Sequence, residues 1–247
     1  DYALTAEHTV KLDTLWKLKA SQRKVLHRKV RLPSKAEDTD SPGTQDRELF
    51  YDAPRKLHGV NVVASITVSS STKLYVAHDS VVKFTGDAIV NAANELGLGG
   101  GGIDGVVNDV GGVELYEARC ALPLISPYVR IPTGDARMTL AGNLPCEKVI
   151  HAVGPRFTSN CPITHAGDLA TLACAYENAL ARAQEAGLKT VAFCLLSSGI
   201  FRGDCPLSDV IECALRSIAK HSYNGLETVI LCAFTIQEQS TVERILT

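Results

Sequence analysis

The chain lacks the features that mark a membrane, secreted or nucleic-acid-binding protein. Its 247 residues carry a formal net charge of −2, so the net charge does not indicate nucleic-acid binding. No apolar run reaches the ~20 residues that cross a bilayer, and no secretory signal is present. With 45% hydrophobic, 21% charged and only 6% aromatic residues, the composition predicts an ordinary globular protein. We therefore expect no membrane partner and no strong nucleic-acid partner.

The chain also lacks any Cys-x-x-Cys pair, although it holds eight cysteines. Cys174, Cys194, Cys213 and Cys232 lie within apolar helix or strand patterns, which predicts buried free thiols. Free thiols indicate a reducing intracellular compartment, either cytoplasm or nucleus. Because the sequence begins at Asp1, a targeting segment could precede it, and a mitochondrial location stays open.

One small group of residues could bind zinc. Cys161 and His165 lie four residues apart, and Cys146 is near them in the sequence. A structural zinc site needs a closed set of four ligands, and none is visible here. We therefore expect no metal.

The sequence divides at about residue 58. Residues 1–32 place Trp16 and other apolar side chains at roughly helical spacing among lysines and arginines, which predicts a basic amphipathic helix. Such a helix can bind a membrane or nucleic acid, but we favour packing on the main domain, because the apolar face needs a partner surface. Residues 33–57 are mostly polar and predict a linker. Residues 58–247 then form the main domain.

Within 58–247, runs of β-branched residues alternate with longer segments of helical periodicity. This alternation predicts an α/β protein, a three-layer α/β/α sandwich with a mixed central sheet and an N-terminal helical extension before it. The expected strands are 60–68, 73–77, 88–92, 129–132, 148–153, 190–196 and 227–234. The expected helices are 106–107, 113–122, 169–187, 206–221 and 238–246.

The densest glycine cluster is Gly99–Gly102, four in a row between an apolar run and a helix. Glycine permits positive φ and close approach of a ligand, and consecutive N–H groups beside a helix start can bind an anion. Asn91, Asn94 and Asp104 bracket the cluster with groups that bind hydroxyls and position water. A flexible surface loop is the alternative, which the strand-to-helix context disfavours.

A second loop, residues 196–206, has a similar chemistry. It leaves a buried strand through Ser197, Ser198 and Gly199, whose hydroxyl and N–H groups suit phosphate oxygens. Phe201 could either pack the loop onto the core or contact a ligand. Ligands of α/β sheets bind outside the carboxyl ends of central strands, where both loops should meet. Together the loops predict a diphosphate site and hence a nucleotide-like ligand.

Three nucleotide-binding chemistries compete for these loops. Gly97-x-Gly99-x-x-Gly102 matches the fingerprint of nicotinamide dehydrogenases, but six residues separate the strand from the first glycine. No strand-terminal acid follows at about 20 residues, where the ribose hydroxyl would need one. A P-loop is excluded, because no Gly-Lys-Ser/Thr follows the glycines. The third hypothesis is a binding site for free or protein-linked ADP-ribose.

Three motifs resemble the signature of the macrodomain family. They are Asp87-Ala-Ile-Val-Asn91-Ala-Ala-Asn94, Gly99-Gly-Gly-Gly102-Ile-Asp104-Gly105 and Ser197-Ser198-Gly199-Ile200-Phe201. The likeness covers roughly residues 58–247 and is greatest to MacroD-type ADP-ribosyl hydrolases. Residues 1–32 of this sequence also resemble the extension that precedes the domain in those proteins. It implies the macrodomain fold, with ADP-ribose and mono-ADP-ribosylated proteins as partners. We expect a monomer that needs no cofactor.

The resemblance also implies roles for matching residues. Asp79 would hydrogen-bond the adenine amino group, near which Phe234 would stack, while Phe201 would orient the distal ribose. Asn94 and Asp104 match the pair on which MacroD-type hydrolysis is thought to depend. The implied substrate-binding residues are Asp79, Ser80, Asn91, Ala92, Ala93, Gly99, Gly100, Gly101, Gly102, Ile103, Ser197, Ser198, Gly199, Ile200, Phe201, Arg202 and Phe234.

The sequence departs from the family pattern at two places. Asn108 stands where the family usually has His, four residues after the aspartate, and this bears on support of the glycine loop. The segment 202–205, Arg-Gly-Asp-Cys, fills the space before Pro206, and this bears on the length of the second loop.

As a function, the resemblance implies a hydrolase that removes mono-ADP-ribose from Asp and Glu side chains and deacetylates O-acetyl-ADP-ribose. Asp104 would position or deprotonate a water, and Asn94 would fix ribose hydroxyls. The alternatives are a non-catalytic ADP-ribose reader and an RNA or poly(ADP-ribose) scaffold. Retention of both Asn94 and Asp104 favours the enzyme over the reader, and the balanced charge disfavours the scaffold.

Overall fold

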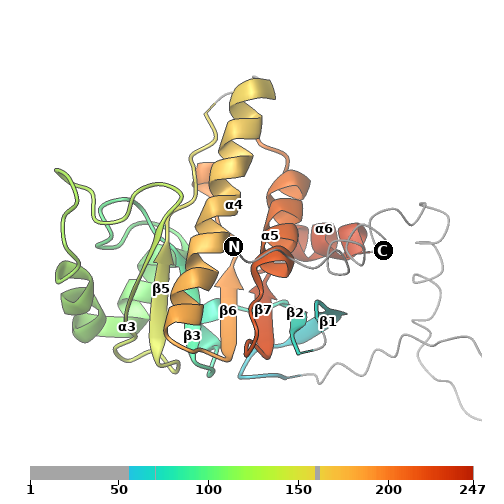
Figure 1. Ribbon diagram of the computed structural model, residues 1–247, viewed down its shortest axis with the longest axis horizontal. Coiled ribbons are helices and arrows are strands. Elements are labelled where there is room, and N and C mark those ends of the chain that lie inside the picture. Colours follow the sequence, from blue (N-terminus) through green and yellow to red (C-terminus); the bar gives the residue numbers. More distant parts are fainter. Residues whose placement is uncertain (1–55, 70, 159–161, 247) are drawn as a thin grey trace, which may run out of the picture. The chain divides into compact units, whose positions relative to one another are not determined.

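The computed structural model describes residues 56–69, 71–158 and 162–246, so the expectations for residues 1–55 lie outside the described residues. A seven-stranded sheet with the order β1-β2-β7-β6-β3-β5-β4 forms the centre of the fold (Figure 1). The strands are β1 Val62–Thr67, β2 Lys73–Ala77, β3 Ala88–Ala92, β4 Ala136–Leu140, β5 Lys148–Ala152, β6 Thr190–Cys194 and β7 Thr228–Cys232.

The inner strands of the sheet all run in one direction. Strands β2, β7, β6, β3 and β5 pair in parallel, while the edge strands β1 and β4 are antiparallel to their neighbours. Strands β3, β6 and β7 are buried at nearly every position, as covered parallel strands must be, whereas β1 alternates between covered and exposed positions. The carboxyl ends of five strands therefore meet at one edge of the sheet.

Helices flank the sheet and complete the predicted α/β/α sandwich. Helix α4 packs beside α5 and contacts β4 and β5 (Figure 1), and α3 contacts β3 and β4. The helices are α3 Ile103–Cys120, α4 Pro162–Glu185, α5 Leu207–His221 and α6 Ile236–Leu246, with short 3-10 turns η2 Val81–Lys83 and η3 Ile200–Arg202. Within the described residues, no helix has the length and apolar content to cross a membrane.

The two helical segments expected after the glycine cluster are both present and together form α3. They are separated by an interruption at Gly112, where φ is 68°, and the second ends at Cys120, two residues before its expected end. The interruption lets another turn of chain approach closely, because a Cβ on Gly142 would lie 2.2 Å from the Gly111 carbonyl oxygen. The helical periodicity of the sequence is interrupted before Val113, and α3 is interrupted at the same place, at Gly112.

The strand expected at 129–132 is wrong. Val129 forms only an isolated bridge with Ser126, and Pro132, which has no N–H, accepts a turn hydrogen bond from Asp135. The strand lies instead at β4, which pairs with β5 in antiparallel register. Its sequence, Ala-Arg-Met-Thr-Leu, has little β-branched character, so composition gave no signal for it.

The cysteine prediction holds for the strands and fails for one helix. Cys194 and Cys232 are buried free thiols and Cys213 is partly buried, but Cys174 is exposed on α4. His165 Nε2 lies 3.2 Å from Asp209 Oδ2, within hydrogen-bond distance. Of the other two proposed zinc ligands, Cys146 is buried and Cys161 lies outside the described residues. Among the residues that the structure describes, no cluster of three metal-ligating side chains occurs.

Candidate functional site

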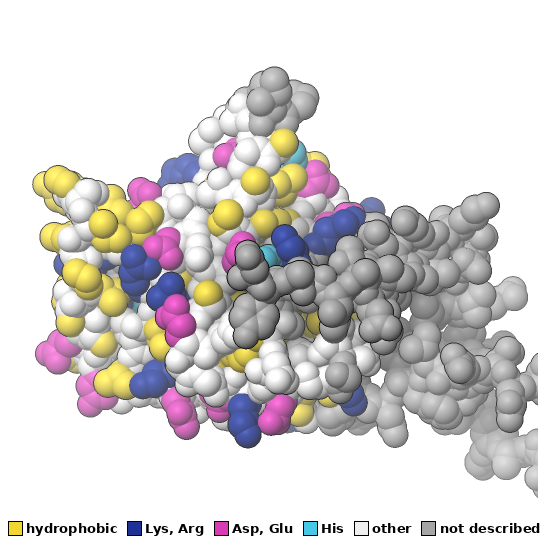
Figure 2. Space-filling model, in the orientation of Figure 1, with side chains coloured by type: hydrophobic (Ala, Val, Ile, Leu, Met, Phe, Trp, Pro, Cys, Tyr) yellow, Lys and Arg dark blue, Asp and Glu magenta, His cyan; other side chains and the backbone are white. Residues whose placement is uncertain are grey.

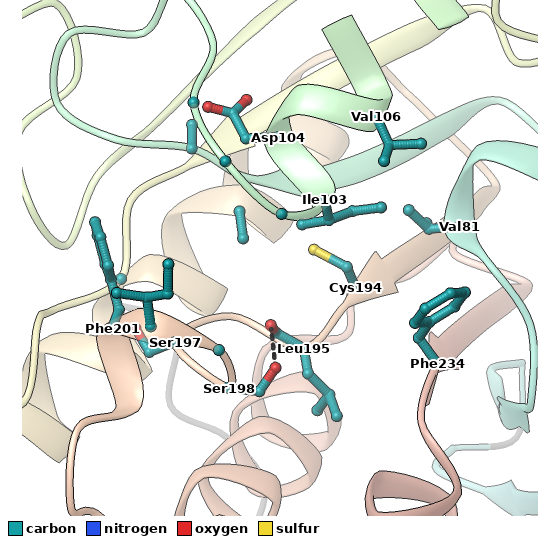
Figure 3. Close-up of a pocket in the computed structure, with 18 of the residues that line it drawn as sticks. Val81, Ile103, Asp104, Val106, Cys194, Leu195, Ser197, Ser198, Phe201 and Phe234 are labelled. Carbon is teal, nitrogen blue, oxygen red and sulfur yellow. Dashed lines mark hydrogen bonds between the residues drawn. The ribbon is translucent and has the colours of Figure 1, made fainter. Parts of the chain in front are cut away.

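A cavity of about 670 Å³ lies at the carboxyl edge of the sheet, within the size range of small-molecule sites. Its lining comes from the loops that follow β2, β7, β6, β3 and β5, in that order along the sheet. In Figure 3 the cavity opens between Ile103 above and Ser198 below, with Phe234 at one end and Phe201 at the other. Neighbouring strands are about 4.8 Å apart, so the floor from β2 to β5 extends roughly 19 Å. The cavity suits an elongated ligand.

Asp79 provides the carboxylate at the β2 end. Its Oδ1 accepts from Ser80 N at 2.8 Å and pairs with Lys83 Nζ at 2.8 Å, while Oδ2 accepts from Asn61 Nδ2 at 3.0 Å. Burial alone would raise the pKa of Asp79, but the hydrogen bonds from Lys83, Ser80 and Asn61 hold this pKa below its ordinary value. Lys83 is 61% exposed, so a ligand N–H can replace it at small cost.

The glycine loop, residues 97–102, is closed by the side chain of Asn94. Asn94 Nδ2 donates to Gly99 O at 3.0 Å, and Gly97 N donates to Asn94 Oδ1 at 3.2 Å. A Cβ on Gly100 would lie 2.9 Å from Asn94 Nδ2 and 3.2 Å from Asp104 Oδ2. The two residues proposed for catalysis therefore meet at Gly100, and only a residue without a side chain fits between them. Asn94 organises the loop as well as lining the cavity.

Asp104 lies in the first turn of α3 and is almost fully buried, with 3% exposure. Its Oδ1 accepts from Arg119 at 2.8 Å and from Asn91 Nδ2 at 2.7 Å. Arg119 is fully buried and its Nε donates to Gly97 O at 2.6 Å, so one guanidinium joins Asp104 to the glycine loop. Oδ2 has no hydrogen-bond partner among the described residues. A carboxylate oxygen without a partner at a cavity wall can accept from a ligand hydroxyl or a water.

His151 supports this network from below. Burial, and then the nearby charge of Arg119, lowers the pKa of His151 well below its ordinary value, so the ring is neutral. Thr139 donates its hydroxyl proton to Leu140 O, so it accepts from His151 Nε2 at 2.9 Å. His151 Nδ1 is then left to accept from Asn91 Nδ2 at 3.2 Å. This histidine tautomer thus orients the side-chain amide of Asn91, whose Nδ2 also donates to Asp104 Oδ1.

The second loop begins with a strained residue. Ser197 has φ of 54°, a left-handed conformation that is uncommon for residues other than glycine, and its Oγ donates to Pro155 O at 2.7 Å. Ser198 Oγ contacts Leu195 O at 3.1 Å (Figure 3), and it also lies 2.9 Å from Glu238 Oε1. These bonds hold the loop against its neighbours on both sides. Residues of this loop and of the glycine loop line the same cavity.

Comparison with known proteins identifies the family. The family model described as "Macro domain" matches residues 90–214, which is half of the chain. This chain belongs to the macrodomain family. The matched segment runs from β3 to α5 and contains both loops that face each other across the cavity.

Several relatives of the macrodomain carry informative names. An "O-acetyl-ADP-ribose deacetylase" of Klebsiella pneumoniae is 35% identical over 165 residues, which cover 65% of this chain and 88% of that protein. A macrodomain of Oceanobacillus iheyensis solved with ADP has a TM-score of 0.66 at 27% identity, covering 74% of this chain and 94% of that one. A Trypanosoma brucei macrodomain in complex with ADP-ribose has a TM-score of 0.59 at 28% identity, covering 70% and 69%.

The macrodomain cavity brings together most of the residues proposed from sequence. Asn91, Gly99 and Arg202 are the exceptions, because they do not line it. Asn91 is fully buried beneath Asp104, and the Arg202 guanidinium donates to Ser198 O and Cys205 O within its own loop. The proposed residues in the lining are Asp79, Ser80, Ala92, Ala93, Asn94, Gly100, Gly101, Gly102, Ile103, Asp104, Ser197, Ser198, Gly199, Ile200, Phe201 and Phe234.

The departure at Asn108 leaves the glycine loop supported. A Cβ on Gly99 would lie 3.5 Å from Asn108 Cγ, so the asparagine side chain packs beneath the loop. The departure in the second loop is also accommodated, because Arg202 NH1 donates to Cys205 O at 2.7 Å and closes the added turn.

Sequence reasoning missed two features of the macrodomain cavity. Cys194 and Cys232 form part of its floor; burial, and then the charges of Glu238 and Asp104, raises the pKa of Cys194 to about 12. Burial likewise raises the pKa of Cys232, so both thiols stay protonated and unreactive at neutral pH. Arg156, in the loop after β5, also lines the cavity, and its guanidinium lies 4.6 Å from the centre of the Phe201 ring. Each cysteine is the last residue of its strand, and Arg156 follows the end of β5, but a sequence pattern does not show which strand ends and loops converge.

Proposed function

We propose that this macrodomain binds ADP-ribose and hydrolyses esters of its distal ribose, releasing mono-ADP-ribose from Asp and Glu side chains and deacetylating O-acetyl-ADP-ribose. One observation carries the proposal. A single elongated cavity holds an adenine-suited carboxylate, Asp79, at its β2 end and the Asn94–Asp104 pair at its β3 end, with two anion-binding loops between them. The names of the Klebsiella and Trypanosoma relatives support the same ligand.

Binding follows from the order of groups along the cavity. The adenine amino group would donate to Asp79, and the exposed ring of Phe234 would cover the base. The diphosphate would lie between the N–H groups of Gly100–Gly102, at the start of α3, and those of the second loop. The distal ribose would then reach Phe201 and Asp104.

Hydrolysis would need little beyond an oriented water. A carboxylate is a good leaving group, so ester cleavage does not require a strong general acid. Asp104 Oδ2, which lacks a partner among the described residues, would accept a proton from the water or fix its position. Oδ1 cannot share this task, because Arg119 and Asn91 already donate to it. No metal or redox cofactor takes part in this scheme.

A non-catalytic reader of ADP-ribose is the second candidate, and one observation favours it. Asp104 is only 3% exposed and is paired with a buried arginine, an arrangement that also serves a purely structural residue. In that case ADP-ribose would bind equally well, but no ester would be cleaved.

The deciding experiment uses the full chain and a glutamate-linked, automodified ADP-ribosylated protein. We expect release of free ADP-ribose and, in parallel, one-to-one calorimetric binding of ADP-ribose that is tighter than binding of NAD. Binding without release would establish the reader instead. Tighter binding of NAD, or no binding of either, would contradict the proposed ligand.

A further inference from the structure

The described lining of the cavity includes one arginine side chain, Arg156, whose position is fixed by the residues on either side of it in the sequence. Arg156 lies between Pro155, whose carbonyl accepts from Ser197 Oγ at 2.7 Å, and Phe157, whose N–H donates to Phe201 O at 2.8 Å. Both flanking residues are thus bonded to the second loop. The Arg156 guanidinium lies 4.6 Å from the centre of the Phe201 ring, within the range of a cation–π contact. The guanidinium lies over the face of the ring, and its N–H groups are the donors that it can offer to a ligand.

The other charges that line the cavity are already matched. Asp79 pairs with Lys83, and Asp104 pairs with Arg119. Glu238 accepts from Phe234 N and Thr235 N at 2.9 Å each, as a cap of α6. Arg156, by contrast, is exposed, and no carboxylate among the described residues forms an ion pair with it. Among the charged side chains of the described lining, this guanidinium is therefore the one still able to bind an anion.

The position of Arg156 in the sheet tells which part of a ligand it meets. The loop after β5 lies beyond β3, at the end of the cavity opposite Asp79. The diphosphate would lie nearer the middle, between loops that already supply N–H donors. Arg156 thus faces what is attached to the distal ribose rather than the nucleotide.

We propose that Arg156 is a specificity-determining residue that binds a second carboxylate of the substrate protein, next to the ester-linked residue. This inference rests on the proposed function. The substrate class is then an ADP-ribosylated acidic segment, in which one carboxylate carries the ester and a neighbouring one meets the guanidinium. A planar guanidinium held against an aromatic ring can donate two parallel hydrogen bonds to a carboxylate.

The test compares two peptides that carry ADP-ribose on the same central glutamate. One has aspartates on both sides of that residue, and the other has serines. We expect the full chain to give about a 3–10-fold higher kcat/KM for the acidic peptide, mainly through a lower KM, as for a partly exposed charge-assisted contact. Raising the ionic strength should reduce this ratio.

The variants Arg156→Gln and Arg156→Lys then assign the preference. Arg156→Gln should bring the ratio of the two kcat/KM values close to one, and Arg156→Lys should leave it intermediate, because ammonium keeps the charge without the planar fork. Arg216→Ala removes a surface arginine of α5, whose NH2 lies 3.7 Å from Glu212, and should leave both values and their ratio unchanged.

Two results would overturn the inference. One is a wild-type chain that does not distinguish the peptides. The other is Arg156→Gln weakening both peptides and free ADP-ribose by the same factor, since the guanidinium would then bind the diphosphate. If no peptide is cleaved at all, the hydrolase proposal fails separately. The dissociation constants of the two intact peptides then carry the same comparison.

Discussion

At the scale of single residues, the two oxygens of Asp104 have different surroundings. Oδ1 accepts from Arg119 and Asn91 and so joins α3 to the glycine loop, while Oδ2 lies beside Gly100 without a partner among the described residues. One side chain would then serve both the architecture of the loop and the proposed chemistry. A substitution has to separate these two tasks before a loss of activity can be interpreted.

Asp104→Asn makes that separation. The amide oxygen can take the place of Oδ1 and keep accepting from Arg119 and Asn91, while the amide nitrogen replaces Oδ2 with a donor. We expect turnover of the glutamate-linked ester to fall about 10²–10⁴-fold, the usual effect of losing a positioned base, with little change in ADP-ribose affinity. Single-turnover kinetics and calorimetry measure the two effects. Full retention of the ester rate would assign Asp104 to the architecture alone.

Asp104→Ala should instead destabilise the protein. It leaves the guanidinium of Arg119, which is fully buried, without its counter-charge. Breaking a buried ion pair in this way typically costs about 3–5 kcal/mol. Thermal unfolding of the alanine and asparagine variants side by side should therefore show a much lower midpoint for alanine.

Asp79 gives a prediction about pH. Because its folded pKa is lowered, its contribution to stability is present above the ordinary aspartate range of about 3.9 and is lost as pH falls through the lower folded value. We expect ADP-ribose affinity to stay level from neutral pH to about pH 5, because the carboxylate remains ionised. Asp79→Ala should weaken binding by about 1–3 kcal/mol at pH 7. Calorimetry across this range checks both statements, and an affinity that declines between pH 7 and 5 would contradict the first.

At the scale of elements, the glycine loop offers a matched pair of substitutions. A Cβ on Gly100 would meet Asn94 Nδ2 and Asp104 Oδ2, at 2.9 and 3.2 Å, whereas a Cβ on Gly101 would meet nothing within 4 Å. Gly100→Ala should therefore cost about 1–3 kcal/mol of stability through overpacking, and Gly101→Ala should leave the unfolding midpoint nearly unchanged. Chemical denaturation of both variants measures the difference. Equal midpoints would show that the loop relaxes around the added methyl group.

The elements also show how far sequence reasoning reached. Two strands were predicted correctly at both ends, 73–77 and 88–92. Strand β3 is buried at nearly every position and has the apolar run Ala88-Ile89-Val90, while the polar residues 69–72 mark the start of β2. Strand β4 was missed because its residues have little β character and it is defined mainly by pairing with β5. The ion pair of Asp104 with Arg119 had no signal, because 15 residues and the break at Gly112 separate the partners.

At the scale of the whole molecule, the order of strands decides which loops can share a ligand. The sequence identified the loops after β3 and β6 by their glycines and serines, and family resemblance supplied Asp79 and Phe234. Arg156 follows β5, in a loop with no distinctive motif, and only the sheet order places it at the cavity. Long-range convergence of this kind is a property of topology, which a local pattern does not encode.

The cavity as a whole predicts a linkage preference. Among the described lining residues there is no histidine or lysine, and both lining cysteines have raised pKa values, so no strong general acid faces the distal ribose. ADP-ribose linked to glutamate or aspartate should therefore be released, while ADP-ribose linked to arginine, an N-glycoside with a poor leaving group, should persist. Incubation with matched substrates of both linkages, followed by quantification of free ADP-ribose, measures this. Equal release from both would require an acid that the described lining does not contain.

Because the cavity runs across consecutive strand ends, ligand fragments of increasing length should contact the lining loops one after another. Adenosine would engage only the β2 and β7 loops, ADP would add the two loops at β6 and β3, and ADP-ribose would extend to the β5 side. Each step lengthens the ligand by one chemical group and adds one set of contacts. Differences in binding free energy along this series would thus isolate the share of the distal ribose without altering a single side chain.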